Sequence, residues 1–137
     1  KVEIYYYCPM RAYLAISQKD LVAFIDSKSI EVDDLFAPTP QFVADNTDCD
    51  EEELEYLLSL AAGEAALDLR LSEKAPGIVL AIEVEQSQIG ESYEDSITLT
   101  SAITWDQIQC ALLAYHGDDE LVWFATQEIE LHCGEWV

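Results

Sequence analysis

Residues 78–84 form a nearly continuous apolar run, Ile-Val-Leu-Ala-Ile-Glu-Val, directly after a break at Pro76-Gly77. A strand with one face in water alternates polar and apolar residues, whereas a run of this kind is typical of a strand in the middle of a sheet. We therefore predict that residues 78–84 form a central strand.

The segment before this break predicts a long helix, from about residue 51 to residue 72. Asp48 is expected to cap it, with Glu51 completing a capping box, and the acids of the first turn favour the positive end of the helix dipole. The apolar stripe consists of Leu54, Leu57, Leu58, Ala61, Ala65 and Leu69. Further leucines widen this stripe, which predicts a helix that is buried on more than one side.

Shorter segments complete the pattern. Strands are expected at 11–16 and 96–100, helices at 18–27 (with Ser17 as N-cap) and 120–130, and loops at 87–95 and at 37–47, the latter with a short turn at 41–44. Residues 108–115 fit either a helix or a strand. The order predicts an α+β fold, a single two-layer domain over 1–137 in which a small mixed or antiparallel sheet packs against two or three helices. Residues 1–9 are interpreted as an N-terminal extension ahead of the first strand.

The net charge of the chain limits the functions that we expect of it. The chain has 28 Asp and Glu against 6 Lys and Arg, a net charge of −22, and residues 75–137 contain no Lys or Arg. Half of the residues are hydrophobic, so the acids are expected to coat a folded core and not to form a disordered tail. A chain of this charge repels nucleic acid and anionic membranes and attracts basic surfaces. We therefore expect no direct nucleic-acid binding and no membrane binding.

The four cysteines, Cys8, Cys49, Cys110 and Cys133, form no C-x-x-C pair. Their irregular spacing is unlike a zinc site or a redox motif and indicates reduced thiols. The sequence also lacks a signal-peptide pattern and any apolar run long enough to span a bilayer. These features predict a cytoplasmic protein.

No motif for a metal, a cofactor or catalysis stands out. The acids at 48–53 lack the central Gly of an EF-hand loop and are interpreted as a capped, solvated helix start. His116, His132 and the cysteines match no zinc spacing, and no nucleophile motif surrounds a cysteine or serine. We expect no metal and no cofactor.

One group of residues near the end is a candidate binding surface. Glu120, Trp123, Gln127 and Glu128 would be neighbours on a helix at 120–130. Trp123 would then be the anchor of a recognition surface, because tryptophan is enriched in binding hot spots. The alternative is that this helix docks on the sheet, with Trp123 or Phe124 in the core.

Four short motifs resemble a known family. They are Met10-Arg11-Ala12-Tyr13-Leu14, Pro38-Thr39-Pro40, Glu52-Glu53-Leu54-Glu55-Tyr56 and the run from Glu120 to Ile129. Over roughly residues 10–129 the chain resembles an uncharacterised family of small acidic actinobacterial proteins, domain of unknown function 6912. The resemblance implies a bacterial, cytoplasmic protein and supplies no activity, ligand or catalytic residue.

The sequence therefore favours a non-catalytic acidic interaction module that binds a basic protein partner. One alternative is an enzyme whose site assembles from scattered residues, around Asp106, His116 and Glu128. Another is a DNA mimic, which would need its acids along one face. A homodimer through an apolar face is a further alternative, although like-charged protomers repel.

Overall fold

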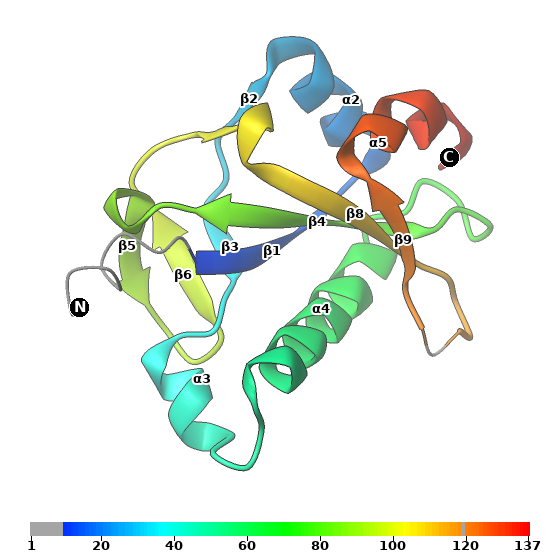
Figure 1. Cartoon of the computed structure of the whole chain (residues 1–137). Coiled ribbons are helices and arrows are strands. Elements are labelled where there is room, and N and C mark those ends of the chain that lie inside the picture. The colour runs from blue at the N-terminus through cyan, green and yellow to red at the C-terminus, as the bar shows by residue number, and fades with distance from the viewer. Residues whose placement is uncertain (1–9, 119) are drawn as a thin grey trace.

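The computed structural model describes residues 10–118 and 120–137, and within them the main sheet has seven antiparallel strands (Figure 1). The strand order is β5-β6-β3-β1-β4-β8-β9. The strands are β1 (Met10–Ile16), β3 (Asp34–Phe36), β4 (Gly77–Val84), β5 (Ile89–Ser92), β6 (Ser96–Leu99), β8 (Ile108–Ala114) and β9 (Val122–Ala125). A separate antiparallel pair consists of β2 (Ser29–Ile30) and β7 (Ile103–Thr104).

Helices cover both faces of the main sheet. They are α2 (Gln18–Ser27), α3 (Pro40–Asp45), α4 (Glu51–Leu67) and α5 (Thr126–His132), with short 3-10 turns η1 (Gln86–Gln88), η2 (Trp105–Gln107) and η3 (Cys133–Glu135). Phe24 of α2 and Ile129 of α5 pack in one core cluster with Leu80 of β4. Leu58 of α4 packs in a second cluster with Val79 of the same strand. Figure 1 accordingly shows α2 and α5 on one side of the sheet and α4 on the other.

The apolar run at 78–84 is the central strand β4, between β1 and β8, as predicted. Its side chains alternate between the two core clusters. Ile78, Leu80, Ile82 and Val84 lie in the α2/α5 cluster, and Val79 and Ala81 lie in the α4 cluster. A strand that is buried on both faces has no position for a water-facing residue, which explains the absence of alternation.

The predicted α+β class and the antiparallel sheet packed against helices are confirmed. The sheet is larger than expected, and its helices form a layer on each face where two layers in total were predicted. The predictions for 11–16, 18–27 and 96–100 agree with β1, α2 and β6, and Ser17 Oγ accepts the Asp20 N–H at 3.1 Å as an N-cap. Residues 108–115 adopt the strand alternative, as β8. The predicted extension at 1–9 lies outside the described residues.

The cap of the long helix differs from the prediction. Asp50 and not Asp48 is the N-cap, and its carboxylate accepts the Glu53 N–H at 2.8 Å while the Glu53 carboxylate accepts the Asp50 N–H at 3.1 Å. Several acids in sequence can cap equally well, so the backbone turn before the helix selects the pair. The α4 capping box is therefore formed two residues later than expected.

The same helix ends at Leu67 and does not reach residue 72. The Arg70 Nε donates to the Leu67 carbonyl at 2.8 Å, which caps the helix end. The chain then returns to β4 so closely that a Cβ on Gly77 would lie 2.8 Å from the Leu67 nitrogen. Leu69 and Leu71 follow the last turn and are 42% and 60% exposed, so they do not extend the apolar stripe.

The predicted helix at 120–130 is wrong in its first half. Residues 122–125 are β9, which pairs antiparallel with β8, and α5 begins at Thr126. A four-residue apolar segment carries too short a pattern for periodicity to separate a strand from a helix. Two loop predictions also change, because residues 89–92 form β5 and residues 40–45 form α3. No helix among the described residues has the length and apolarity to cross a membrane.

Candidate functional site

The structure separates the four residues that were predicted to share one helix. Glu120 is exposed just before β9, Trp123 lies on β9, and Gln127 and Glu128 lie on α5. Glu128 has a structural role, because its carboxylate accepts the Ala125 N–H at 2.9 Å at the start of α5. Trp123 is 60% exposed, whereas its neighbour Phe124 packs against the α2/α5 core cluster, so the docking alternative holds for Phe124 and not for Trp123.

Trp123 lies on the face of the sheet that α4 covers. It pairs directly with Leu112 of β8, which packs against the α4 cluster, and directly paired residues share a face. The Trp123 indole N–H also acts on the thiol of Cys110 on β8, whose pKa it lowers. These contacts hold the indole at the edge of the sheet with most of its surface in solvent.

Cys110 continues a row of paired residues across the sheet. Tyr13 of β1 pairs with Ala81 of β4, Ala81 pairs with Cys110 of β8, and Cys110 pairs with Ala125 of β9. The small Ala81 leaves the phenol and the thiol as the two reactive groups of this row. Tyr13 and Cys110 are both buried beneath α4, at 4% and 5% exposure.

Burial keeps both groups neutral. It raises the pKa of Tyr13 to about 12, with a further upward contribution from Glu55 of α4 and a smaller downward one from Arg11. Burial also raises the pKa of the Cys110 thiol, against the lowering effects of Arg11 and of the Trp123 indole N–H. Because the thiolate is the nucleophile, a thiol with a raised pKa is poorly suited to covalent catalysis.

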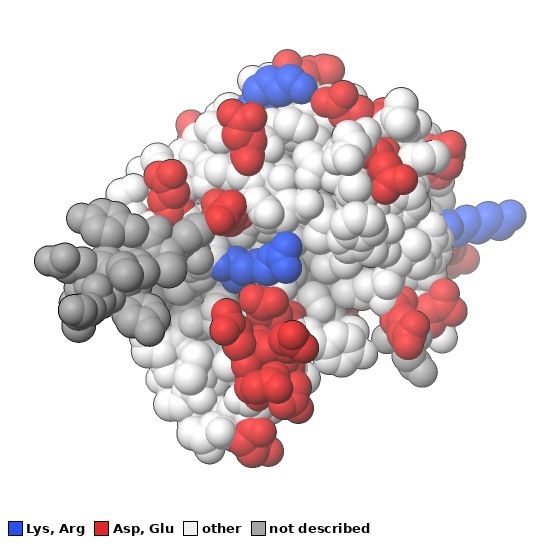
Figure 2. All heavy atoms as spheres, viewed as in Figure 1, with Lys and Arg blue, Asp and Glu red and all other residues white. Residues whose placement is uncertain are grey.

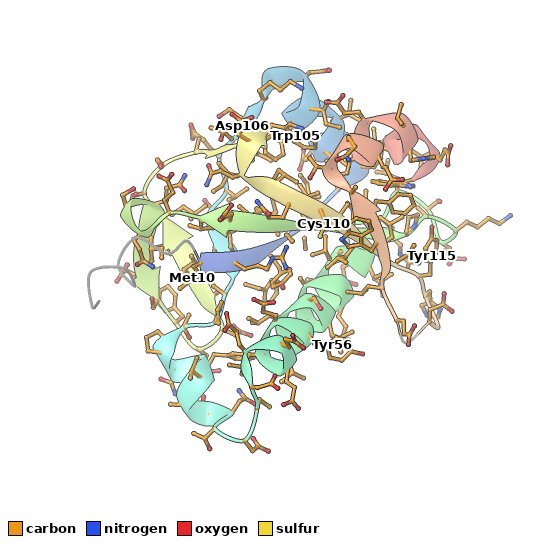
Figure 3. All side chains as sticks on the ribbon, viewed as in Figure 1. Met10, Tyr56, Trp105, Asp106, Cys110 and Tyr115 are labelled. Carbon is orange, nitrogen blue, oxygen red and sulfur yellow. The ribbon has the colours of Figure 1, made fainter. Side chains whose placement is uncertain are left out.

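We call the exposed side chains of Tyr56 and Trp123, on the side of the sheet that α4 covers, the aromatic surface; Tyr13 and Cys110 are buried beneath α4. Tyr56 is 53% exposed on α4, and Figure 3 shows it on this helix, with Cys110 on the sheet beside the helix. Further along α4, a Cβ on Gly63 would lie 3.2 Å from Leu121 Cδ2, so the same helix passes close to the start of β9.

An acidic segment adjoins the aromatic surface. We define it as residues 45–55, whose acids are Asp45, Asp48, Asp50, Glu51, Glu52, Glu53 and Glu55. Figure 2 shows carboxylates gathered over the start of α4, beside a largely uncharged area over β8 and β9. The charge of Glu55, the last acid of this segment, acts on the buried Tyr13 hydroxyl.

The residues of the enzyme alternative do not converge. Asp106 lies in η2 just before β8 and His116 lies just after it, so the length of a seven-residue strand separates them. Glu128 is engaged at the start of α5. Among the described residues, no group of three or more His, Cys, Asp or Glu is placed to hold a metal ion, and Cys49, Cys110 and Cys133 are free thiols.

A shallow cavity of about 240 Å³ lies elsewhere, between the segments at 31–32 and 99–102. It presents one carboxylate, from Glu31, together with the hydroxyls of Thr100 and Ser101. The Thr100 hydroxyl already donates to the Ser87 carbonyl at 2.8 Å. One of its two hydroxyls is therefore already engaged within the protein.

Comparison with known proteins gives one match. The model of a family of unknown function, DUF6912, matches residues 10–117. Neither the curated proteins nor the solved structures contain a match to the chain.

Proposed function

Because the chain belongs to the family of unknown function DUF6912, which brings no activity with it, we propose its function from the geometry. The proposal is a non-catalytic, cytoplasmic acidic interaction module that binds a basic protein partner. The observation that carries it is the exposed ring of Tyr56 on α4, one helical turn from Glu52 and Glu53 of the acidic segment. Exposed aromatic rings and carboxylates in one region suit Lys and Arg side chains.

The exposure of the carboxylates, and the small number of ion pairs that they make, support a partner outside the chain. Every Asp and Glu in the described residues is exposed or half-buried. Within this part of the molecule, ion pairs engage Glu130, with Lys28 at 3.2 Å, and Glu135, with His132 at 3.6 Å. The remaining acids have no such neighbour, so a basic surface gains charge attraction without displacing internal pairs.

The exposed aromatic residues add the local recognition that charge alone lacks. Surface ion pairs contribute little individually, about 0–1 kcal/mol each, and salt weakens them. Tyr and Trp, by contrast, are enriched among residues that dominate binding energy. Trp123 and Tyr56, both more than half exposed, are the residues we expect to fix where a basic segment binds.

DNA mimicry receives less support. A mimic needs its carboxylates along one face, whereas the acids here occur on α4, on α2 and on α5, which lie on opposite faces of the sheet. The dense acidic segment is a single region at the start of α4. A compact acidic region beside aromatic rings fits a basic peptide segment better than it fits a DNA-binding groove.

A peptide titration with two charge-matched variants tests the proposal. One variant carries Glu51→Gln, Glu52→Gln and Glu55→Gln in the acidic segment, and its control carries Glu31→Gln, Asp33→Asn and Asp34→Asn on the exposed segment around β3. Calorimetry at low salt with a short Lys-rich peptide should show about tenfold weaker binding for the first variant and little change for the control.

The salt dependence and the control variant show which results would overturn the proposed function. Binding should weaken steeply as NaCl is raised, because exposed charges are screened. Equal losses in the two variants would mean that net charge alone attracts the peptide. Equal losses, or an absence of binding at low salt, would overturn the proposed module.

A further inference from the structure

We propose that the basic partner binds as an added β-strand along β9, with a Lys or Arg side chain over Trp123. This inference rests on the proposed function and specifies the mode of binding. β9 is the last strand in the sheet order, and its outer side has no neighbouring strand in the described part of the chain. Partner strands commonly add to open edges of this kind, through main-chain hydrogen bonds.

The backbone of Trp123 faces outward from the sheet. The Ala125 N–H donates to the Glu128 carboxylate at 2.9 Å and is therefore turned away from β8. In an antiparallel edge strand, alternate residues direct both backbone groups toward the partner strand or away from it. Trp123, two residues before Ala125, thus presents its N–H and its carbonyl to an incoming strand.

The two ends of the sheet differ in how they are protected. Natural edges are commonly blocked by bulges, charged residues or proline. β5, at the opposite end, has an irregular register between Ile89 and Ser92 and includes Gly90 and Glu91. β9 reads Val-Trp-Phe-Ala, pairs regularly with β8, and has none of these features. The contrast identifies β9 as the edge that is open to pairing.

Charge selects the occupant. Asp118 and Glu120 are exposed just before β9, and Glu128 follows it, while residues 75–137 contain no Lys or Arg. A second copy of this chain would bring the same carboxylates to the edge, and like charges across paired strands are destabilising. A basic extended segment meets these carboxylates with opposite charge. Its residue opposite Trp123 exchanges both backbone bonds and lies on the same face as the indole, where a cation–π contact forms.

Two complementary peptides test this geometry with the unmodified protein. Both alternate Lys and Thr; in one the Lys amides are N-methylated, and in the other the Thr amides are. Lys lies opposite Trp123 in the paired register, so its amide donates to the Trp123 carbonyl. Methylation of the Lys amides should weaken binding about tenfold or more, and methylation of the Thr amides should have little effect, because the Thr amides face away from β9.

A pair of variants tests the protein side. Trp123→Pro removes the outward N–H, which an edge strand tolerates, and Trp123→Ala keeps this N–H while also removing the indole. The Pro variant should bind the unmethylated peptide about tenfold more weakly than the Ala variant. Circular dichroism checks that both variants remain folded, and the methylated peptides decide the question if Trp123→Pro unfolds.

The outcomes separate the two proposals. Salt-sensitive binding of the unmethylated peptide together with equal effects of the two methylation patterns would overturn strand addition and leave the acidic module standing. No binding of any peptide at low salt would overturn both. Self-association of the protein through β9, lost in Trp123→Pro, would replace the basic segment with a second copy and also overturn the inference.

Discussion

The indole N–H of Trp123 on β9 lowers the pKa of the Cys110 thiol on β8, although the direct partner of Trp123 in the sheet is Leu112 and that of Cys110 is Ala125. The contact is therefore diagonal across the two strands, within the reach of a large aromatic side chain. It connects the exposed tryptophan of the aromatic surface to a buried thiol beneath α4.

Removal of the Trp123 indole N–H should raise the pKa of Cys110, because this donor lowers it. Trp123→Phe keeps an aromatic ring but has no N–H donor. The pKa follows from the pH dependence of iodoacetamide alkylation, in a background where Cys8, Cys49 and Cys133 are serine. Trp105→Phe, in η2, is the control and should leave the profile unchanged. An unaltered profile in Trp123→Phe would contradict the contact.

Tyr13 should ionise late in an alkaline titration. Its pKa is raised from 10.0 to about 12 in the folded protein, mainly by burial. The neutral phenol is favoured in the folded state, so its contribution to stability is complete below about pH 10 and is lost as the pH rises toward 12. Tyr13→Phe should remove both the late tyrosinate absorbance and this part of the alkaline loss in urea stability. Retention of the late absorbance would assign it to another tyrosine.

Gly77→Ala should destabilise the protein by about 1–3 kcal/mol, as overpacking does in other cores. The new methyl group would lie 2.8 Å from the backbone of Ala66 and of Leu67, which cannot move without shifting the end of α4. Gly134→Ala is the matched control, because a Cβ there meets nothing within 4 Å. Urea denaturation compares the two, and equal midpoints would show that α4 and β4 are less tightly apposed.

Gln88→Ala should cost about 2–3 kcal/mol in unfolding free energy, since it leaves buried polar groups without partners. The Gln88 amide is 8% exposed, accepts the Glu85 N–H at 3.1 Å, and donates to the Ala102 carbonyl at 3.1 Å. Gln109→Ala removes an exposed bond to Glu83 of similar length, 3.0 Å, and should cost less than about 1 kcal/mol. Urea denaturation that ranks the two variants in reverse would refute the buried network.

Added NaCl should stabilise the folded protein. A net charge of −22 produces self-repulsion that is strongest in the compact state, and salt screens it over a Debye length of about 10 Å at 0.1 M. The urea midpoint should therefore rise from low salt to moderate salt. A midpoint that falls would indicate that ion pairs, such as Lys28–Glu130, outweigh the repulsion.

The aromatic surface could be predicted only in part. Trp123 is 60% exposed, and its role as an anchor stays a prediction; the acidic run near residue 50 was visible in the sequence. Tyr13 and Cys110 were missed because pairing across β1, β4 and β8 brings distant segments together, and Tyr56 was missed because it depends on how α4 packs on this sheet. An apolar-aromatic strand at 10–16 was the available signal for Tyr13, and nothing in the local sequence indicated its neighbour Cys110.

Local features decided much of the fold. The apolar run at 78–84 determined a central strand because burial on both faces allows no water-facing position, and Ser17 determined the start of α2 because its hydroxyl can cap an N–H locally. The tertiary structure decided the rest. Residues 122–125 are a strand because β8 lies beside them, and α4 ends at Leu67 because the chain must return to β4 at Gly77. Those outcomes depend on partners far along the chain, and a short segment carries no record of its partners.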